Sequence, residues 1–315
     1  DPFEGIVDIH DRIKCVGNPY ERFREDPLRI LRAIRFDTQL NIHIETKTYI
    51  ASLDLIDLLD SISAERIQQE FLKSLDTVNF ANVFMRQIRV MFKVFPEFET
   101  CYLFDQKNPY HIYDVYNHSV EAVLHVEDKD RITKIATMLH DIGKPDCCIE
   151  DENGIRHFKG HGKRSAEIAD SILQRLRFDN HTRESVVELI KYHDAEFVVG
   201  KKHVRRWLNR IGEDQFRRLL DIREADVKAQ NPAYIQDRID KVQTIRLQLE
   251  EVLQEQSCFS LKDLNISGSD ILSLGYASSP KIGQCLHYLL DNVIDELLSN
   301  DHESLLKSAE EFMSK

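Results

Sequence analysis

An adjacent histidine and aspartate, His140 and Asp141, end an apolar segment that runs from 132 to 142. The apolar residues of this segment recur at helical spacing and predict a helix with one buried face. Gly143 suits a left-handed cap, and Pro145 cannot continue a helix. A neutral imidazole beside a carboxylate at a buried helix end is costly unless something binds both. Mn, Fe, Zn or Ni suits such donors, whereas an isolated pair is as well explained by a hydrogen-bonded core histidine beside a solvated aspartate.

Four further histidine and aspartate residues stand in similar settings, namely His118, His161, His193 and Asp226. His118 shares a predicted helix face with apolar neighbours, and His193 and Asp226 do the same on later segments. His161 lies between two glycines at the start of another predicted helix. Several histidine and aspartate residues at positions where a helix face would otherwise be apolar predict a metal site on a helical scaffold.

The order His, His-Asp, His, His, Asp resembles the HD phosphohydrolase superfamily, in its variant with ligands for two metals. The resemblance implies that one ion is held by His118, His140, Asp141 and Asp226. It implies that Asp141 bridges to a second ion held by His161 and His193. The metals would be Mn, Fe, Ni or Mg, and the site would hydrolyse a phosphate ester with Asp141 and Lys144 in catalytic roles. Ordinary surface charge is an equally good interpretation of Lys144 alone. The histidines outside the pattern, expected to serve surface or packing roles, are His111, His125 and His157.

A second region of interest begins at Glu25-Asp26 and carries arginines at positions 29, 32 and 35. Asp26 is a natural N-cap, and Pro27 suits the first helical position. The three-residue spacing of the arginines alone fits a solvated helix face. The segment resembles, however, the neck of the bacterial CCA-adding tRNA nucleotidyltransferase and poly(A) polymerase family, which carries Glu-Asp-x-x-Arg here. The resemblance implies that Asp26 and Arg29 read the pairing edge of the incoming CTP or ATP, and that Arg32 and Arg35 meet the nucleotide from the following turns.

The same family resemblance extends to both sides of this helix. The opening residues 1–8 resemble the link out of the family's catalytic head, and Ser63 would cap the next neck helix. The head itself, with the carboxylates that hold Mg²⁺ for nucleotidyl transfer, would lie upstream of Asp1. The chain by itself is therefore expected not to add nucleotides.

The most basic run of the chain extends from 201 to 210 and includes Arg205 and Arg206. A helix with this pattern presents a positive face that suits the phosphate backbone of tRNA, although a solvated helix explains it equally well without the family context. The segment 264–290 resembles the helical tail of the same family. Lys281 would contact RNA there, at a helix start whose free N–H groups suit a phosphate.

Composition limits the classes of function. The formal net charge of −12 argues against binding nucleic acid through overall charge, but leaves room for a local basic face. The six cysteines form no Cys-x-x-Cys pair, which favours free thiols in a reducing cytoplasm. No apolar run approaches a membrane span, so we expect no membrane partner.

The sequence predicts an all-α protein with an elongated multi-helix neck, an HD helical domain and a helical tail, and at most a short strand pair near the N-terminus. The expected boundaries are 1–107 for head end, neck and connector, 108–232 for the metal-binding domain, and 233–315 for the tail. The leading interpretation is the neck, body and tail of a tRNA nucleotidyltransferase. The alternatives are a stand-alone metal phosphohydrolase acting on nucleotides or RNA phosphate ends, and a non-catalytic RNA-holding module.

Overall fold

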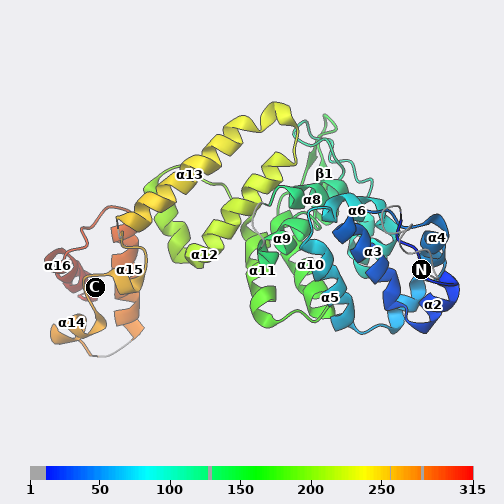
Figure 1. Cartoon of the computed structure of the whole chain (residues 1–315). Helices are drawn as coiled ribbons and strands as arrows, with labels where there is room; N and C mark the ends of the chain where they lie inside the picture. The colour runs from blue at the N-terminus through cyan, green and yellow to red at the C-terminus, as the bar shows by residue number, and fades with distance from the viewer. Residues whose placement is uncertain (1–11, 127–129, 256, 278–279, 315) are drawn as a thin grey trace. The chain divides into compact units, whose positions relative to one another are not determined.

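The structure is a computed structural model that describes residues 12–126, 130–255, 257–277 and 280–314. Its regular structure is almost entirely helical, and in these ranges the single named sheet has two strands (Figure 1). The predicted all-α class is therefore confirmed. Contacts divide the chain into two compact units, of which unit 1 comprises 1–195 with 221–239 and unit 2 comprises 196–220 with 240–315. The boundaries at 107 and 232 stay a prediction.

The first helices of unit 1 carry the predicted nucleotide-recognition residues. In chain order they are α2 (Pro19–Glu25), α3 (Leu28–Leu40), α4 (Thr46–Asp54), α5 (Ala64–Leu75), α6 (Phe80–Arg86) and α7 (Ile88–Val94), with 3₁₀ helices η1 (Ile56–Ser61) and η2 (Pro96–Thr100). Helix α3 begins one residue later than predicted, and the Asp26 Oδ1 atom accepts a hydrogen bond from the Leu28 backbone N–H at 3.3 Å. It ends at Asn41, whose φ of 53° is left-handed, a conformation that asparagine tolerates.

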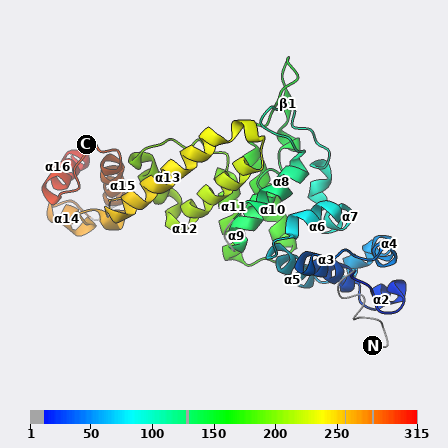
Figure 2. The same ribbon diagram turned by 45° about the horizontal axis from the view of Figure 1, so that its top comes forward.

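The remaining elements of unit 1 surround the His-Asp turn. They are α8 (Val115–Leu124), α9 (Arg131–Leu139), η3 (Pro145–Cys147), β1 (Ile149–Glu150), β2 (Arg156–His157), α10 (His161–Arg175), α11 (Asn180–Tyr192), the end of α12 (Lys201–Lys228) from residue 221 on, η4 (Pro232–Tyr234) and the start of α13 (Gln236–Gln254) up to residue 239. Figure 2 shows the hairpin of β1 and β2 at the periphery of this unit. A short strand pair was expected near the N-terminus instead. Residues 6–9 of that prediction lie outside the described residues, and Ile13 forms a single parallel bridge with Ile44.

Packing between α5 and α9 joins the two regions of unit 1. Arg131 forms two hydrogen bonds with Asp76 at 2.9 and 2.6 Å, and the Lys134 ammonium donates to the Leu75 carbonyl at 3.2 Å. Beneath them lies a fully buried aromatic cluster in which the Tyr116 hydroxyl donates to the Phe84 carbonyl at 3.0 Å. Because aromatic side chains bury large apolar areas, this core fixes α8 and hence His118.

Unit 2 is built from residues 201–220 of α12, α13 from residue 240 on, η5 (Leu261–Asp263), α14 (Gly268–Ser273), α15 (Pro280–Ile294) and α16 (His302–Met313). Helix α12 is kinked at Gly212, whose φ of 78° favours glycine. The last three helices bury a shared apolar core that includes Cys285, Leu289 and Leu305.

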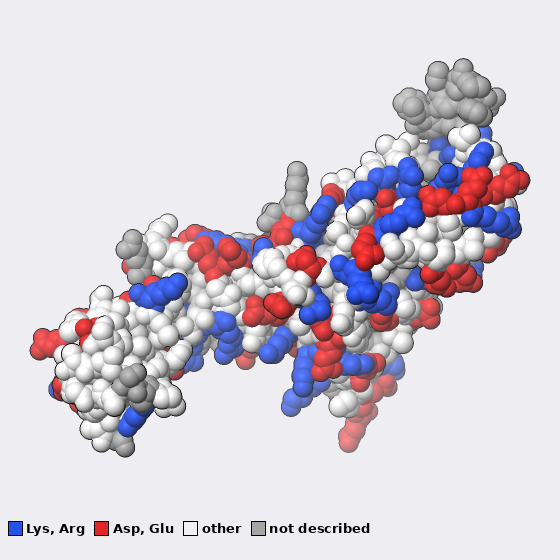
Figure 3. All heavy atoms as spheres, turned by 90° about the horizontal axis from the view of Figure 1, so that it is seen from below, with Lys and Arg blue, Asp and Glu red and all other residues white. Residues whose placement is uncertain are grey.

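Both signs of charge are present on the face of unit 1 drawn in Figure 3. Figure 3 shows positive and negative side chains interleaved over the visible face of unit 1. Contacts to nucleic acid must therefore be made by local groups of residues, as the net charge of −12 also implies. Among the described residues, no helix has the length and apolar character that crossing a bilayer requires.

Candidate metal centre

The turn that carries His140 and Asp141 is set by helix α9 and by its contact with α10. Asp130 caps α9 by accepting from the Ile132 N–H at 3.1 Å, and the apolar face of α9 is buried as predicted. The predicted left-handed role of Gly143 is wrong, because its φ lies outside the left-handed region. A Cβ at this position would lie 2.6 Å from the Ser165 backbone nitrogen. Glycine is required here by the close approach of α10.

All four predicted histidines direct one ring nitrogen at a backbone carbonyl. The Nδ1 atom of His118 lies 3.4 Å from the Ala229 carbonyl oxygen, and that of His140 lies 2.6 Å from the Thr137 oxygen. The Nδ1 atoms of His161 and His193 each lie 2.7 Å from a carbonyl oxygen, of Phe158 and Ile190 respectively. A carbonyl can only accept, so each Nδ1 carries the proton and donates it. Each Nε2 then points into the cluster, which is the arrangement in which metal-binding histidines are usually held.

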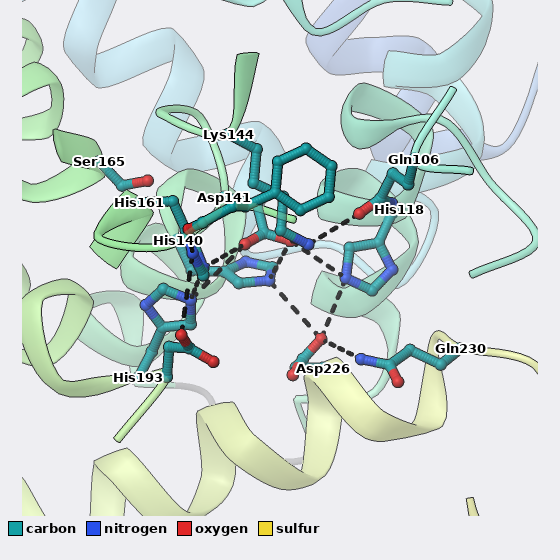
Figure 4. A network of polar contacts seen from close by, with 12 residues as sticks. Gln106, His118, His140, Asp141, Lys144, His161, Ser165, His193, Asp226 and Gln230 are labelled. Carbon is teal, nitrogen blue, oxygen red and sulfur yellow. Dashed lines mark hydrogen bonds and ion pairs between the residues drawn. The ribbon is translucent and has the colours of Figure 1, made fainter. Parts of the chain in front are cut away.

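The Nε2 atoms converge on Asp141, with two histidines near each carboxylate oxygen (Figure 4). The distances to Oδ2 are 3.6 Å from His118 and 3.1 Å from His140, and those to Oδ1 are 3.3 Å from His161 and 3.5 Å from His193. Two groups able to hold a metal ion result, which are His118–His140–Asp141 and Asp141–His161–His193. Asp226 joins the first group, since its Oδ1 lies 3.0 Å from His118 Nε2 and 3.7 Å from His140 Nε2.

The donor set fits divalent ions. Asp141 Oδ2 is buried, with His140 Nε2 at 3.1 Å and the Lys144 ammonium at 2.7 Å, and the Nε2 atoms of His161 and His193 face each other at 3.1 Å. Two lone pairs at that distance repel unless a proton or a cation lies between them. Burial opposes protonation of His140, but the carboxylates of Asp141 and Asp226 outweigh it and raise the pKa of His140 to about 10. Burial raises the pKa of Asp141, but the positive charges of His140 and Lys144 outweigh burial and hold this pKa well below its usual range.

Lys144 lies within the same cluster. Its ammonium contacts Asp141 Oδ2 at 2.7 Å and donates to the Gln106 side-chain oxygen at 2.7 Å. It also lines a cavity of about 380 Å³ together with Asp141, His161, His193 and Asp226. Lys144 is therefore placed both to orient the shared carboxylate and to meet a ligand in the cavity.

Other residues of the cavity were not predicted from the sequence. They are Tyr110, His111, Asp194, Arg223, Gln230 and Arg238. Gln230 connects the metal centre to this wall, because its amide donates to Asp226 at 2.8 Å and its oxygen accepts from Arg238. His111 is a buried neighbour of His118, with ring centroids 5.0 Å apart, and burial together with nearby positive charge lowers its pKa to about 3. The side chains of these six residues lie on segments without a regular apolar pattern, so the sequence did not mark them as part of a site.

Of the predicted nucleotide-binding residues, Asp26 lies just before α3 and the three arginines lie on it. Arg29 is held by the Glu25 carboxylate at 3.1 Å, and Asp26 is held by Arg66 of α5 at 3.3 Å. Arg32 is exposed, whereas Arg35 is paired with buried Glu70 at 2.9 Å. The sequence gave no indication of Arg66, because its partner lies forty positions away. Asp26, Arg29 and Arg32 thus lie on an accessible surface, and Arg35 has a largely structural setting.

The predicted RNA-binding residues lie in unit 2. Arg205 is mostly buried in an ion pair with Glu296, and Arg206 pairs with Asp295 at 2.6 Å. The Lys281 ammonium donates to the Met313 carbonyl at 3.1 Å. All three cations have protein partners, so an RNA phosphate would have to share or displace them. Their RNA contacts stay a prediction.

Chelation is expected to destabilise unit 1, because an ion that binds only the folded cluster stabilises it by mass action. An ion present at a hundredfold excess over its dissociation constant contributes about 2.7 kcal/mol. We expect protein treated with a chelator to unfold at a lower temperature, and Mn²⁺ to restore the midpoint. Thermal unfolding followed by circular dichroism measures the shift. An unchanged midpoint after addition of each candidate metal would contradict the assignment.

The fold and site define an all-α protein with a buried cluster of histidines and carboxylates suited to two ions. Comparison with protein families identifies two adjacent matches. The family described as "Probable RNA and SrmB- binding site of polymerase A" matches residues 41–110. The family described as "tRNA nucleotidyltransferase domain 2 putative" matches residues 161–309.

Curated relatives agree with these matches. The chain is 28% identical over 309 residues to the A-adding tRNA nucleotidyltransferase of Deinococcus radiodurans, covering 92% of this chain and 69% of that protein. It is 27% identical over 304 residues to the CCA-adding enzyme of Staphylococcus saprophyticus, covering 96% and 64% respectively. The chain thus spans about two thirds of the length of these relatives.

Solved structures share the fold. The CCA-adding enzyme of Bacillus stearothermophilus in complex with CTP superposes with a TM-score of 0.66 at 18% identity, covering 100% of this chain and 69% of that one. The Thermotoga maritima CCA-adding enzyme complexed with tRNA gives 0.53 at 18% identity, covering 99% and 67%. The chain is thus similar to tRNA nucleotidyltransferases, which are enzymes, over nearly its whole length. The HD phosphohydrolase part of the sequence prediction is a separate question and stays a prediction.

Proposed function

We propose that this chain selects the nucleotide and holds the tRNA in an enzyme that adds nucleotides to the 3′ end of tRNA. The observation that carries the proposal is the similarity to tRNA nucleotidyltransferases, together with the partly exposed positions of Asp26, just before α3, and Arg29, in its first turn. An arginine fork and a carboxylate offer donors and acceptors that complement the pairing edge of a base. The comparisons do not favour the alternative of a stand-alone phosphohydrolase.

The partners of this activity follow from the similar proteins. One solved relative is a complex with CTP, another with ATP and a third with tRNA. We extend these ligands to this chain, with Mg²⁺ as the ion for nucleotidyl transfer, RNA contacts at Arg205, Arg206 and Lys281, and a cytoplasmic location. The test uses protein expressed from its complete gene. Incorporation of CTP or ATP into tRNA lacking its 3′ end supports the proposal, and inactivity with both nucleotides contradicts it.

A second activity is favoured by the metal centre itself. We propose that it hydrolyses a phosphate ester, such as a 2′,3′-cyclic phosphate or a nucleotide monophosphate. The carrying observation is the convergence of four histidine Nε2 atoms on Asp141 beside a cavity that Lys144 also lines. Divalent ions, plausibly Mn, Fe, Ni or Mg, would activate water and offset charge on the phosphoryl oxygens.

The residues of the site divide the work of this hydrolysis. Asp141 holds the two groups of histidines together, and the Lys144 ammonium meets a phosphoryl oxygen. Water adds to phosphorus, the ester P–O bond breaks, and the leaving alcohol takes the proton that water gives up. Lys144 also keeps Asp141 in place through their 2.7 Å contact.

Hydrolysis is expected to depend on the metal and on His140. Protein loaded with Mn²⁺ or Ni²⁺ should hydrolyse at least one member of a panel of cyclic and linear nucleotides, and His140→Ala should lower kcat at least a hundredfold because it removes a ligand. Phosphate release measures the rate. The matched control is His157→Ala, since His157 is exposed on β2 and pairs with Asp151 outside the cluster. A metal-loaded protein inert toward the whole panel would leave the site structural.

A further inference from the structure

The cavity beside the metal centre has a second wall that the metal ligands do not form. This wall contains Tyr110, Arg223 and Arg238, and Gln230 connects it to Asp226. The cavity volume of about 380 Å³ falls within the range of roughly 300–1,000 Å³ found for small-molecule sites. There is room here for a ligand considerably larger than a phosphate ion.

The two arginines of this wall belong to different helices. Arg223 of α12 donates to the His193 carbonyl at 3.0 Å and lies 4.0 Å from the Asp194 carboxylate. Arg238 of α13 is partly buried and donates to the neutral amide oxygen of Gln230, and no carboxylate among the described residues forms an ion pair with it. Burial lowers the pKa of Arg238 and outweighs the attraction of the Asp226 and Asp194 carboxylates, so additional negative charge would stabilise this guanidinium. An anion in the cavity would supply that charge, and the planar fork of arginine suits phosphate.

Tyr110 lines the same cavity, and Tyr234 packs beside it. The rings of Tyr110 and Tyr234 meet edge to face with centroids 5.3 Å apart. Their residues are 46% and 49% exposed, so ring surface remains open to a ligand. Asn231 fixes the loop that carries Tyr110, because its backbone N–H donates to the Tyr110 carbonyl at 2.8 Å and its side chain donates to the Pro109 carbonyl at 3.0 Å. A positioned aromatic face beside a phosphate site is where a nucleobase stacks.

We propose that this cavity binds a phosphorylated nucleoside, either free or as the terminal residue of an RNA strand. Arg223 and Arg238 hold the phosphate beside the metal centre, and the Tyr110–Tyr234 pair stacks on the base. The inference rests on the proposed phosphohydrolase function for its place in a reaction. Binding itself requires no turnover and is measured separately.

The test of base recognition is equilibrium binding by calorimetry, with Mg²⁺ and after chelation. The probes are AMP, ribose 5-phosphate, orthophosphate and a short RNA with a 3′-phosphate. AMP is expected to bind roughly 5- to 150-fold more tightly than ribose 5-phosphate, because the base stacks. Tyr110→Ala should abolish this preference, and Tyr110→Phe should retain it. The matched control is Tyr113→Ala, since Tyr113 is an exposed tyrosine of the same loop that does not line the cavity.

The test of phosphate recognition uses Arg238→Gln, which removes the charge and keeps much of the side-chain length. This variant should weaken the binding of AMP and of ribose 5-phosphate by the same factor, about tenfold or more, because hydrogen bonds to charged groups are strong. Lys241→Gln removes a positive charge from an exposed position of the same helix and should leave both affinities unchanged.

The outcomes separate the two proposals. Tighter binding of the RNA end identifies RNA as the source of the ligand, tighter binding of AMP identifies a free nucleotide, and both support the inference. Equal affinity for AMP and ribose 5-phosphate, or no binding of any probe, overturns it. A protein that binds AMP through Tyr110 but hydrolyses no ester keeps this inference and refutes the hydrolase.

Discussion

Asp141→Ala is expected to remove both metal ions at once, reducing the bound metal from about two equivalents to none. Its two carboxylate oxygens face different pairs of histidines, so neither group keeps its carboxylate. Metal analysis of protein purified without chelator measures the content, and titration with Mn²⁺ measures any residual affinity. Loss of the carboxylate also leaves Lys144 buried and unpaired, which costs on the order of 3–5 kcal/mol.

A second substitution distinguishes metal loss from misfolding. Asp141→Asn keeps the shape of the side chain and should also lose the ions, because a neutral amide is a poor substitute for a bridging carboxylate. Asp146→Ala is the matched control, since Asp146 lies nearby, is exposed and pairs with Arg164. Full metal occupancy in a folded Asp141→Asn protein would show that Asp141 does not bridge two ions.

Asp26→Ala and Arg29→Ala are each expected to blur the choice of CTP and ATP over UTP and GTP. Each lost hydrogen bond to the correct base contributes on the order of 1–3 kcal/mol, which lowers discrimination roughly 5- to 150-fold. The measurement is kcat/KM for each nucleotide with tRNA lacking its 3′ end, using protein expressed from the complete gene. Both variants should still fold, because both side chains are partly exposed, and Asp26→Ala additionally loses the hydrogen bond from the Leu28 N–H.

The control for this pair is Arg24→Ala. Arg24 is exposed on the preceding helix and contacts Tyr20, so its loss should leave nucleotide choice intact. Arg66→Ala is expected to resemble a weaker Asp26→Ala, because Arg66 holds Asp26 without being a predicted reader of the base. Unchanged discrimination in both Asp26→Ala and Arg29→Ala would refute their assignment as readers of the base.

The all-α class and the spatial grouping of six histidine and aspartate residues were both accessible from the sequence. Helical periodicity predicted the buried faces of α8, α9 and α11, and the polar exceptions on those faces lie together in the structure. The order of the residues then provided the family resemblance. That these residues bind metal remains a proposal, but their proximity needed no information beyond the pattern.

The other wall of the cavity could not be predicted in this way. Arg223, Gln230 and Arg238 lie on segments rich in charge, where a functional side chain and a solvated one look alike. Helix periodicity gives the face of a single helix and does not say which two helices meet. The short hairpin at 149–157 was likewise missed, because strands of two residues carry no periodicity.

Gly143 has a consequence for how this protein can diverge. It permits the backbone of α10 to approach the His-Asp turn, and a methyl group there would lie 2.6 Å from the Ser165 nitrogen. Any larger residue would push the start of α10 outward and carry His161 away from Asp141. Gly143 should therefore tolerate substitution poorly, although it has no side-chain atom that could bind an ion. In a lineage that lost the chemistry of the centre, the histidines could vary first. Gly143 would stay conserved for as long as α10 packed against the His-Asp turn.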